Sequence, residues 1–298
     1  MNDSARAEFS RLRKWVLVLA TASSIFQACQ NAKNVHQDSI VFARSGTRRA
    51  GFMRLRTGEA IPISYLVAGD EAIIEGDINI GRAADVERFS VAVSARPRLA
   101  PPEAFLAVGE GGRWPNGEIP YCIADNLPNP ARVLQAVAHW NAVTHIRLHD
   151  AGAFCKILTG PRLLHINFVP GNRCASAIGM QVRNQDIELD PRCSSDNVIH
   201  EIGHAVGLWH EQSRLDRDTF VEIIFSNIPS ENHHDFDKHL GQVVGPYDFQ
   251  SIMHYKPFDF AVDPSKPTIV ARTPGVIIGN QTGQLTANDI AAVNQMYP

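Results

Sequence analysis

The spacing of apolar residues predicts a helix in the middle of the chain. Between residues 130 and 143, Val133, Leu134, Val137 and Trp140 recur at intervals of three or four. That period places them on one helical face, which a surrounding core would bury. We therefore expect a helix here with one apolar side.

Further elements follow this helix. The apolar or alternating segments 146–148 and 163–169 predict strands. A helix is expected from about 198 to 207, with Asp196 or Asn197 as its cap. Beyond residue 210, regular patterns are scarce until a short helix at 287–297, so we expect a loop-rich second half.

The region from 30 to 104 has a different pattern. Short apolar stretches at 61–67 and 89–93 alternate with Arg-rich and Gly-containing turns. Segment 95–102 is rich in proline and arginine, a composition that resists regular structure and favours proteolytic nicking. It predicts a connector between two parts of the chain.

The first residues are typical of an export signal. Basic residues in 11–14 precede an apolar run at 15–28, which is shorter than the roughly 20 residues that span a bilayer. The alternative is a buried amphipathic helix. Cleavage could follow the small residues at 20–22. Alternatively, 26–29 is a degenerate lipoprotein box, and Cys29 would then carry lipid.

Composition narrows the class of protein. With 298 residues, 44% hydrophobic and 20% charged, the chain is neither disordered, collagen-like nor a polytopic membrane protein. The net charge of −3 offers no basic field for nucleic acid. Four of the five cysteines lie between 122 and 193. Export would permit disulfides, and four cysteines allow three pairings.

The candidate chemistry is concentrated in residues 200–211. His200 and His204 are one helical turn apart, so their imidazoles share a face and suit a zinc ion. Glu201 lies about 100° round the helix, where it can reach a water on the metal. Gly207 can end the helix and bring His210 back as a third ligand. Three protein ligands leave a position open, which is the catalytic zinc pattern.

A second group of residues lies at 251–255. Met253 alone is typical of core packing, but beside an extended zinc motif it predicts a Met-turn beneath the metal. Tyr255 follows two residues later. Its phenol could ligate the metal or donate to a developing oxyanion, and the alternative is a buried aromatic with a satisfied hydroxyl.

These motifs resemble the astacin-like zinc peptidases, a branch of the metzincins. Glu211 directly follows the third histidine, as in astacins, and segment 251–255 matches their Met-turn with its tyrosine. Segments 114–121, 214–221 and 285–297 resemble the start, the post-zinc segment and the last helix of the domain. The similarity covers about 105–298.

The resemblance implies an α+β fold with two lobes. The upper lobe would hold a mixed sheet and the zinc helix, and the lower lobe would be irregular. Zn²⁺ would be bound by His200, His204 and His210, with Tyr255 as a fifth ligand. Glu201 would be the general base, taking a proton from water and passing it to the leaving amine.

The resemblance also implies how the chain is organised. We expect a signal peptide at 1–28, a pro-segment at 29–104 and a catalytic domain at 105–298. The product would be a secreted or cell-envelope endopeptidase, acting as a monomer on protein or peptide substrates. It would bind no nucleic acid and have no membrane span. In the family, the glutamate matching Glu211 binds the new N-terminus.

Segment 74–78 resembles the aspartate switch of astacin pro-segments, with Ile74 in place of phenylalanine. Gly76 would let the backbone turn so that the Asp77 carboxylate reaches the zinc and keeps the precursor latent. The alternative is an ordinary Gly-Asp turn between two strands. Cys29 is the competing latency ligand.

The cysteines match the family in part. Cys174 and Cys193 resemble its disulfide ahead of the zinc helix. The family's other bridge has no counterpart, because one of its positions is His145 and the C-terminus has no cysteine. Cys122 and Cys155 are therefore left to pair with each other.

Three alternatives remain open. The chain could be a binding protein that keeps the metzincin fold without turnover, although it retains both the glutamate base and the tyrosine. It could be a matrixin or serralysin, from which Glu211 separates it. His233, His234 and His239, near two aspartates, could form a second metal site, although a solvated loop is favoured.

Overall fold

The computed structural model describes residue 42 and residues 46–95, 109–156, 164–239 and 244–298. Its strands are β1 (Thr47–Arg54), β2 (Ala60–Ala68), β3 (Glu71–Ile74), β4 (Ile78–Arg82), β5 (Glu118–Ile123), β6 (Arg147–Asp150), β7 (Ile166–Pro170), β8 (Cys174–Ala177), β9 (Gln185–Leu189), β10 (Val221–Ile223) and β11 (Ile269–Ala271). Its α-helices are α2 (Ala83–Ala95), α3 (Ala131–Val143), α4 (Ser195–Val206) and α5 (Ala287–Met296).

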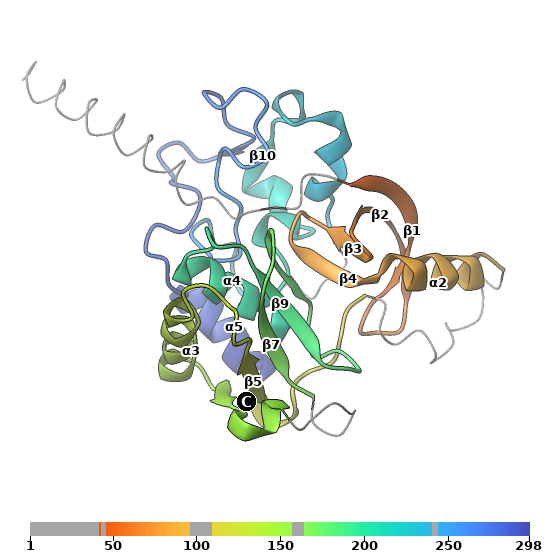
Figure 1. Ribbon diagram of the computed structural model, residues 1–298. Coiled ribbons are helices and arrows are strands. Elements are labelled where there is room, and N and C mark those ends of the chain that lie inside the picture. Colours follow the sequence, from red (N-terminus) through yellow and green to blue (C-terminus); the bar gives the residue numbers. More distant parts are fainter. Residues whose placement is uncertain (1–41, 43–45, 96–108, 157–163, 240–243) are drawn as a thin grey trace, which may run out of the picture. The chain divides into compact units, whose positions relative to one another are not determined.

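Within the described ranges, nine of the strands form one mixed sheet in the order β1-β2-β3-β4-β8-β9-β7-β5-β6 (Figure 1). Strands β1 to β4 form an antiparallel meander. Strand β4 then pairs in parallel with β8 through Ile78 opposite Ser176 and Asn79 opposite Ala177. The sheet therefore continues from the expected pro-segment into the catalytic part, a continuity that the sequence did not predict.

The expected α+β class is confirmed. Helices α3, α4 and α5 share one core with strands β5 to β9, and Trp140, Ile166, Phe168 and Val198 are fully buried in it. After α4 the chain forms short 3₁₀ turns and the two-stranded β10–β11 sheet, as expected of a loop-rich second half.

One helix begins earlier than the sequence suggested, and another was not predicted. Helix α4 starts at Ser195 and is capped by Ser194, whose backbone N–H donates to Asn197 Oδ1 at 2.9 Å, so the expected start near 198 is wrong. A serine at this position can satisfy the free N–H groups of the first turn. The apolar stretch 89–93 is part of α2, which begins at Ala83.

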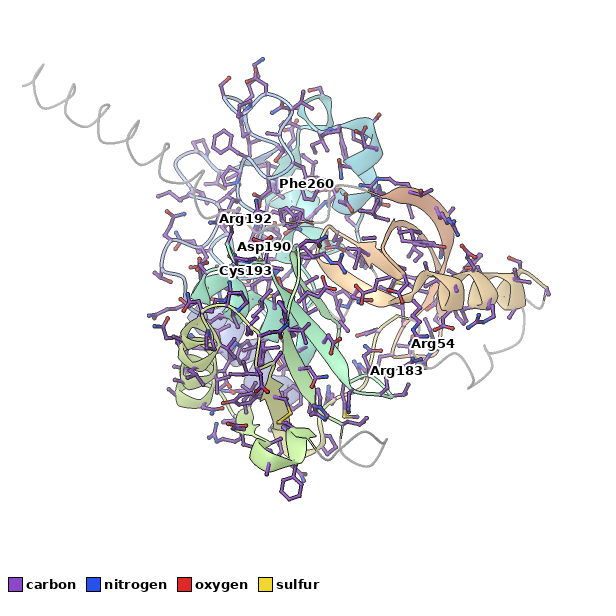
Figure 2. The ribbon with its side chains drawn as sticks, viewed as in Figure 1. Arg54, Arg183, Asp190, Arg192, Cys193 and Phe260 are labelled. Atoms are coloured by element: carbon purple, nitrogen blue, oxygen red, sulfur yellow. A yellow bond between two sulfur atoms is a disulfide. The ribbon has the colours of Figure 1, made fainter. Side chains whose placement is uncertain are left out.

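Two disulfides are present among the described residues. Cys174 on β8 is bonded to Cys193, and Cys122 on β5 is bonded to Cys155. Cys193 lies in the turn that enters α4, beside Asp190 and Arg192 (Figure 2). The first bridge therefore ties the start of the zinc-motif helix to the sheet.

His145 is hydrogen-bonded to the end of the chain. Its backbone N–H donates to Asn294 Oδ1 at 2.7 Å, and its Nδ1 lies 2.9 Å from the carbonyl oxygen of Tyr297. These contacts hold the end of α5 against the start of β6 without a disulfide.

The described residues all belong to one compact unit, Ile40–Pro298. None of its described helices has the length and apolarity that crossing a bilayer requires. The expected signal at 1–28, Cys29 and most of the Pro-rich connector lie outside the described residues.

Candidate active site

Helix α4 carries the first two histidines and the glutamate between them. His200, Glu201 and His204 are each at most 1% exposed. The helix ends because Gly207 adopts φ +112°, a backbone conformation that suits glycine. This turn brings His210 back, and the ring of His210 lies 5.1 Å from that of His200 and 4.7 Å from that of His204.

Each imidazole is oriented through its Nδ1 atom. His200 Nδ1 lies 2.8 Å from the carbonyl oxygen of Ile252, and His204 Nδ1 lies 2.8 Å from that of Leu208. His210 Nδ1 lies 2.5 Å from a carboxylate oxygen of Glu75. Because these acceptors require a proton on Nδ1, each Nε2 keeps its lone pair for a metal ion.

The Asp77 carboxylate completes this group. Its oxygens lie 3.4 Å from His200 Nε2, 3.4 Å from His210 Nε2 and 3.7 Å from His204 Nε2. One ligand atom from each of the four residues lies within 4.8 Å of the others, and all four are buried. Asp77 comes from the turn between β3 and β4, where Gly76 has φ +79°.

These residues fit a zinc ion. Two atoms bound at about 2.0–2.1 Å in a tetrahedral site lie roughly 3.3 Å apart. The Nε2 atoms of His200 and His210 are 3.2 Å apart. Both Asp77 oxygens and His204 Nε2 are buried without a hydrogen-bond partner among the described residues, as expected of atoms meant for a cation.

Charge in the cluster is uneven. Burial alone would raise the pKa of Asp77, but the charge of His210 and the close His200 and His204 side chains hold that pKa well below its usual range. Burial and the nearby Asp77 charge raise the pKa of Glu201 well above its usual value. The Asp77 charge therefore disfavours the ionised form of Glu201.

Tyr255 lies beside His210, and Met253 lies against Gly203 on helix α4. Met253 is 2% exposed, and the Tyr255 ring lies 4.7 Å from the His210 ring. The turn that carries them is held by Asp289 at the start of α5. Its carboxylate accepts from Ser251 Oγ at 2.6 Å and from the Ile252 N–H at 3.0 Å.

Comparison with known proteins identifies the family. A family model described as Astacin, a peptidase family, matches residues 108–298, which is more than half of the chain. The chain belongs to the astacin family. Peptidases of this family are zinc enzymes, in agreement with the donor set of His200, His204 and His210.

Relatives support the assignment. The chain is 37% identical over 250 residues to Meprin A subunit alpha from Rattus norvegicus, covering 80% of this chain and 32% of that protein. It is 30% identical over 190 residues to Zinc metalloproteinase nas-4 from Caenorhabditis elegans, covering 62% and 59%. The chain thus spans about a third to three fifths of these relatives' lengths.

A solved structure shares the fold. High choriolytic enzyme 1, a hatching enzyme zinc-protease from Oryzias latipes, superposes with a TM-score of 0.55 at 29% identity, covering 62% of this chain and 92% of its own. The rat relative matches 80% of the chain, which is more than 108–298 contains, so that similarity begins upstream of the astacin domain.

Glu75, which lies upstream of the astacin domain, contacts the histidine cluster and was missed by sequence reasoning. It is 1% exposed; Ser213 Oγ donates to its carboxylate at 2.9 Å, and His239 Nε2 contacts the other carboxylate oxygen. His239 and His210 lower its pKa to about 2 although burial raises it. The sequence signal that could have indicated this residue was a charged side chain between Ile74 and Gly76, directly before Asp77.

Glu211 lies apart from the metal cluster. It borders a cavity of about 120 Å³, together with Gly112, Asp248 and Met253. Its carboxylate accepts from the Asp248 N–H at 2.8 Å and from Arg214 Nη1 at 3.1 Å. Burial outweighs these contacts and raises the pKa of Glu211 to about 7.

The suggested second metal site is not formed in the described part of the chain. There, the one group of three or more metal-binding side chains is Asp77 with the three motif histidines. His233 contacts the carbonyl oxygens of Phe225 and Ile228 at 3.1 Å. His234 contacts Arg48, and His239 contacts Glu75, so both meet the expected pro-segment.

Proposed function

We propose that this chain is a zinc-dependent endopeptidase that cleaves peptide bonds in proteins and is made as a latent precursor. The observation that carries the proposal is the convergence of three metal-facing Nε2 atoms with a carboxylate from outside the astacin domain. Asp77 lies upstream of residue 108, where the family match begins. The three Nε2 atoms support catalysis by a bound metal, and the upstream origin of the Asp77 carboxylate supports latency.

The chemistry divides among the chain's own residues. Bound zinc would supply a Lewis acid that acidifies water and polarises a carbonyl group. Glu201, next to His200, would accept the proton from the attacking water and pass it to the leaving amine. Tyr255 would donate a hydrogen bond to the oxyanion. Met253 packs against Gly203, between His200 and His204 in the sequence of α4, and would support their arrangement.

Latency rests on three contacts of the same segment. Asp77 takes a ligand position at the histidines. Glu75 holds His210 through its side chain and Tyr255 through its carbonyl oxygen. Strand β4 pairs with the edge of β8, along which an extended substrate would otherwise bind. Residues 75–79 would thus keep the catalytic water from the metal, occupy the hydroxyl of Tyr255 and block the strand edge that a substrate would use.

Export is the third part of the proposal. A signal at 1–28 would direct the chain to a secretory route, and the two disulfides agree with an oxidising compartment. We infer a pro-segment at 29–104 and a monomeric catalytic domain at 105–298. A lipid on Cys29 would keep the enzyme at the cell envelope.

The test uses the full precursor and the product from which everything upstream of residue 105 has been removed, as checked by mass spectrometry. Both should contain about one zinc per chain, and the product alone should hydrolyse casein. Treatment with 1,10-phenanthroline should abolish the activity, and added zinc should restore it. A zinc-loaded product without hydrolysis would instead support a binding protein that keeps the fold.

A further inference from the structure

Residues 46–95, which we call the pro-domain, supply all but one of the buried residues of one hydrophobic cluster, the exception being Ile178 of the astacin domain. Met53, Tyr65, Val86 and Phe89 are each at most 1% exposed and belong to one cluster, which is separate from the core beneath α4. Strands β1 to β4 supply one side of this cluster and α2 supplies the other (Figure 1). A meander closed by a helix is enough to bury an apolar face.

Helix α2 is fixed to the meander by hydrogen bonds as well as by packing. Ser90 Oγ accepts from the Phe52 N–H at 2.8 Å and donates to the Val86 carbonyl oxygen at 2.7 Å. Within the same unit, exposed Arg49 on β1 pairs with Glu87 on α2. The pro-domain therefore has the internal contacts of a folded module.

Its contacts with the astacin domain are both apolar and polar: Ile178 belongs to the same hydrophobic cluster, Trp209 packs against that cluster, and several further contacts are charged. Besides Glu75 and Asp77, Arg48 contacts His234 and lies 3.7 Å from the buried Asp235 carboxylate. Glu71 on β3 pairs with Arg173 at the start of β8. These charged groups lie at separate points of one surface, so they fix the orientation of the pro-domain.

The chain beyond the connector is also held by the pro-domain. Gly109 N–H donates to the Ile80 carbonyl oxygen at 2.9 Å, and Glu110 N–H donates to the Arg54 carbonyl oxygen at 2.9 Å. A cut between 96 and 108 would remove none of these contacts. The described residues on either side of the cut would keep their contacts between the pro-domain and the astacin domain.

We propose that the pro-domain is a folded inhibitor that stays on the astacin domain after the connector is cut. Its partner is the astacin domain of its own chain, on which it is docked here. Activation then requires dissociation or destruction of the pro-domain, and cleavage of the connector alone gives a latent two-chain complex. This inference rests on the proposed peptidase function.

The test places a recognition sequence for a site-specific protease in 96–108 of the full chain. After complete cutting, the two fragments should co-elute in size-exclusion chromatography at micromolar concentration. Casein hydrolysis per catalytic domain should be low and should rise on dilution as the fragments separate. Separate elution, or full activity at every concentration, would overturn the inference.

Matched variants of the cut protein sharpen the test. Arg48→Ala removes a contact to the astacin domain and should raise the dissociation constant about tenfold. Arg49→Ala, which loses a pair inside the pro-domain, should leave that constant unchanged. Phe89→Ala should unfold the pro-domain and give activity at all concentrations, but Arg48→Ala does not depend on unfolding. Equal effects of Arg48→Ala and Arg49→Ala would contradict the docked surface.

The two proposals fail differently. If the fragments separate and the isolated, zinc-loaded astacin domain hydrolyses casein, the retained inhibitor is wrong and the peptidase function stands. If the fragments co-elute but the isolated domain is inactive with zinc bound, docking stands and the peptidase function is wrong.

Discussion

The hydroxyl of Tyr255 donates a hydrogen bond to the carbonyl oxygen of Glu75 at 2.5 Å. Both residues are at most 1% exposed, and they lie 180 positions apart in the sequence. The side chain of the same glutamate accepts from His210 Nδ1. One residue of the pro-domain thus holds both the proposed oxyanion donor and a proposed metal ligand.

If Tyr255 is the oxyanion donor, Tyr255→Phe in the processed enzyme should lower kcat by about 10²–10³. KM should change much less, because the hydrogen bond is made mainly in the transition state. Steady-state kinetics on a peptide substrate measures both constants, and zinc content serves as the control. A kcat within about twofold of the wild type would leave Tyr255 with a structural role alone.

Glu201→Ala should abolish hydrolysis and leave zinc bound. The substitution removes the proposed base but none of the three imidazoles, and His200 and His204 keep their Nδ1 partners, which lie in the astacin domain. Metal analysis should still give about one zinc per chain while peptide cleavage falls to background. Appreciable residual turnover in the processed variant would contradict the assignment of the base.

The histidine cluster could be predicted from sequence because its spacing is local. His200 and His204 are one turn apart, and the turn at Gly207 returns the chain within three residues. Period and capping rules likewise indicated α3 and α5 nearly to their ends. These rules gave α4 the wrong start because several adjacent polar residues could each have capped the helix, and the actual cap is Ser194.

The remaining features depend on pairing between distant residues. Glu75 and His210 are separated by 135 positions, and no local pattern encodes their contact. Strands β4 and β8 pair through only two residue pairs, which is too few to produce a recognisable sequence pattern in either strand. Similarly, Asp289 at the start of α5 supports the Met-turn through contacts 37 and 38 residues away.

Asp77→Ala should give an uncleaved precursor with activity. The fourth ligand is lost, and the pKa of Glu201 should fall because the Asp77 charge helps to raise it. The other docking contacts remain, so we expect partial activity, at least about tenfold above the wild-type precursor, on a short peptide. Cys29→Ser should stay latent. An inactive Asp77→Ala precursor beside an active Cys29→Ser precursor would make Cys29 the latency ligand.

Docking of the pro-domain should weaken as the pH rises through about 7. Burial raises the pKa of Glu188 to about 7 in the docked state, against the Arg173 charge, and Glu71 and Asp186 raise it further. Undocking removes Glu71 and moves this pKa toward its ordinary value of 4.5. A pKa that is higher in the docked state means that docking takes up a proton. This contribution is complete below pH 4.5 and is lost above pH 7.

For the connector-cut complex, the dissociation constant should therefore be about tenfold larger at pH 8.5 than at pH 6. Fluorescence anisotropy of a labelled pro-domain measures this constant without relying on catalysis. Glu188→Gln is the matched control, because it keeps the size of the side chain, cannot titrate and should flatten the profile. If wild type and Glu188→Gln show the same pH dependence, other groups control docking. If the wild-type complex becomes tighter at high pH, the sign of the predicted proton uptake is wrong.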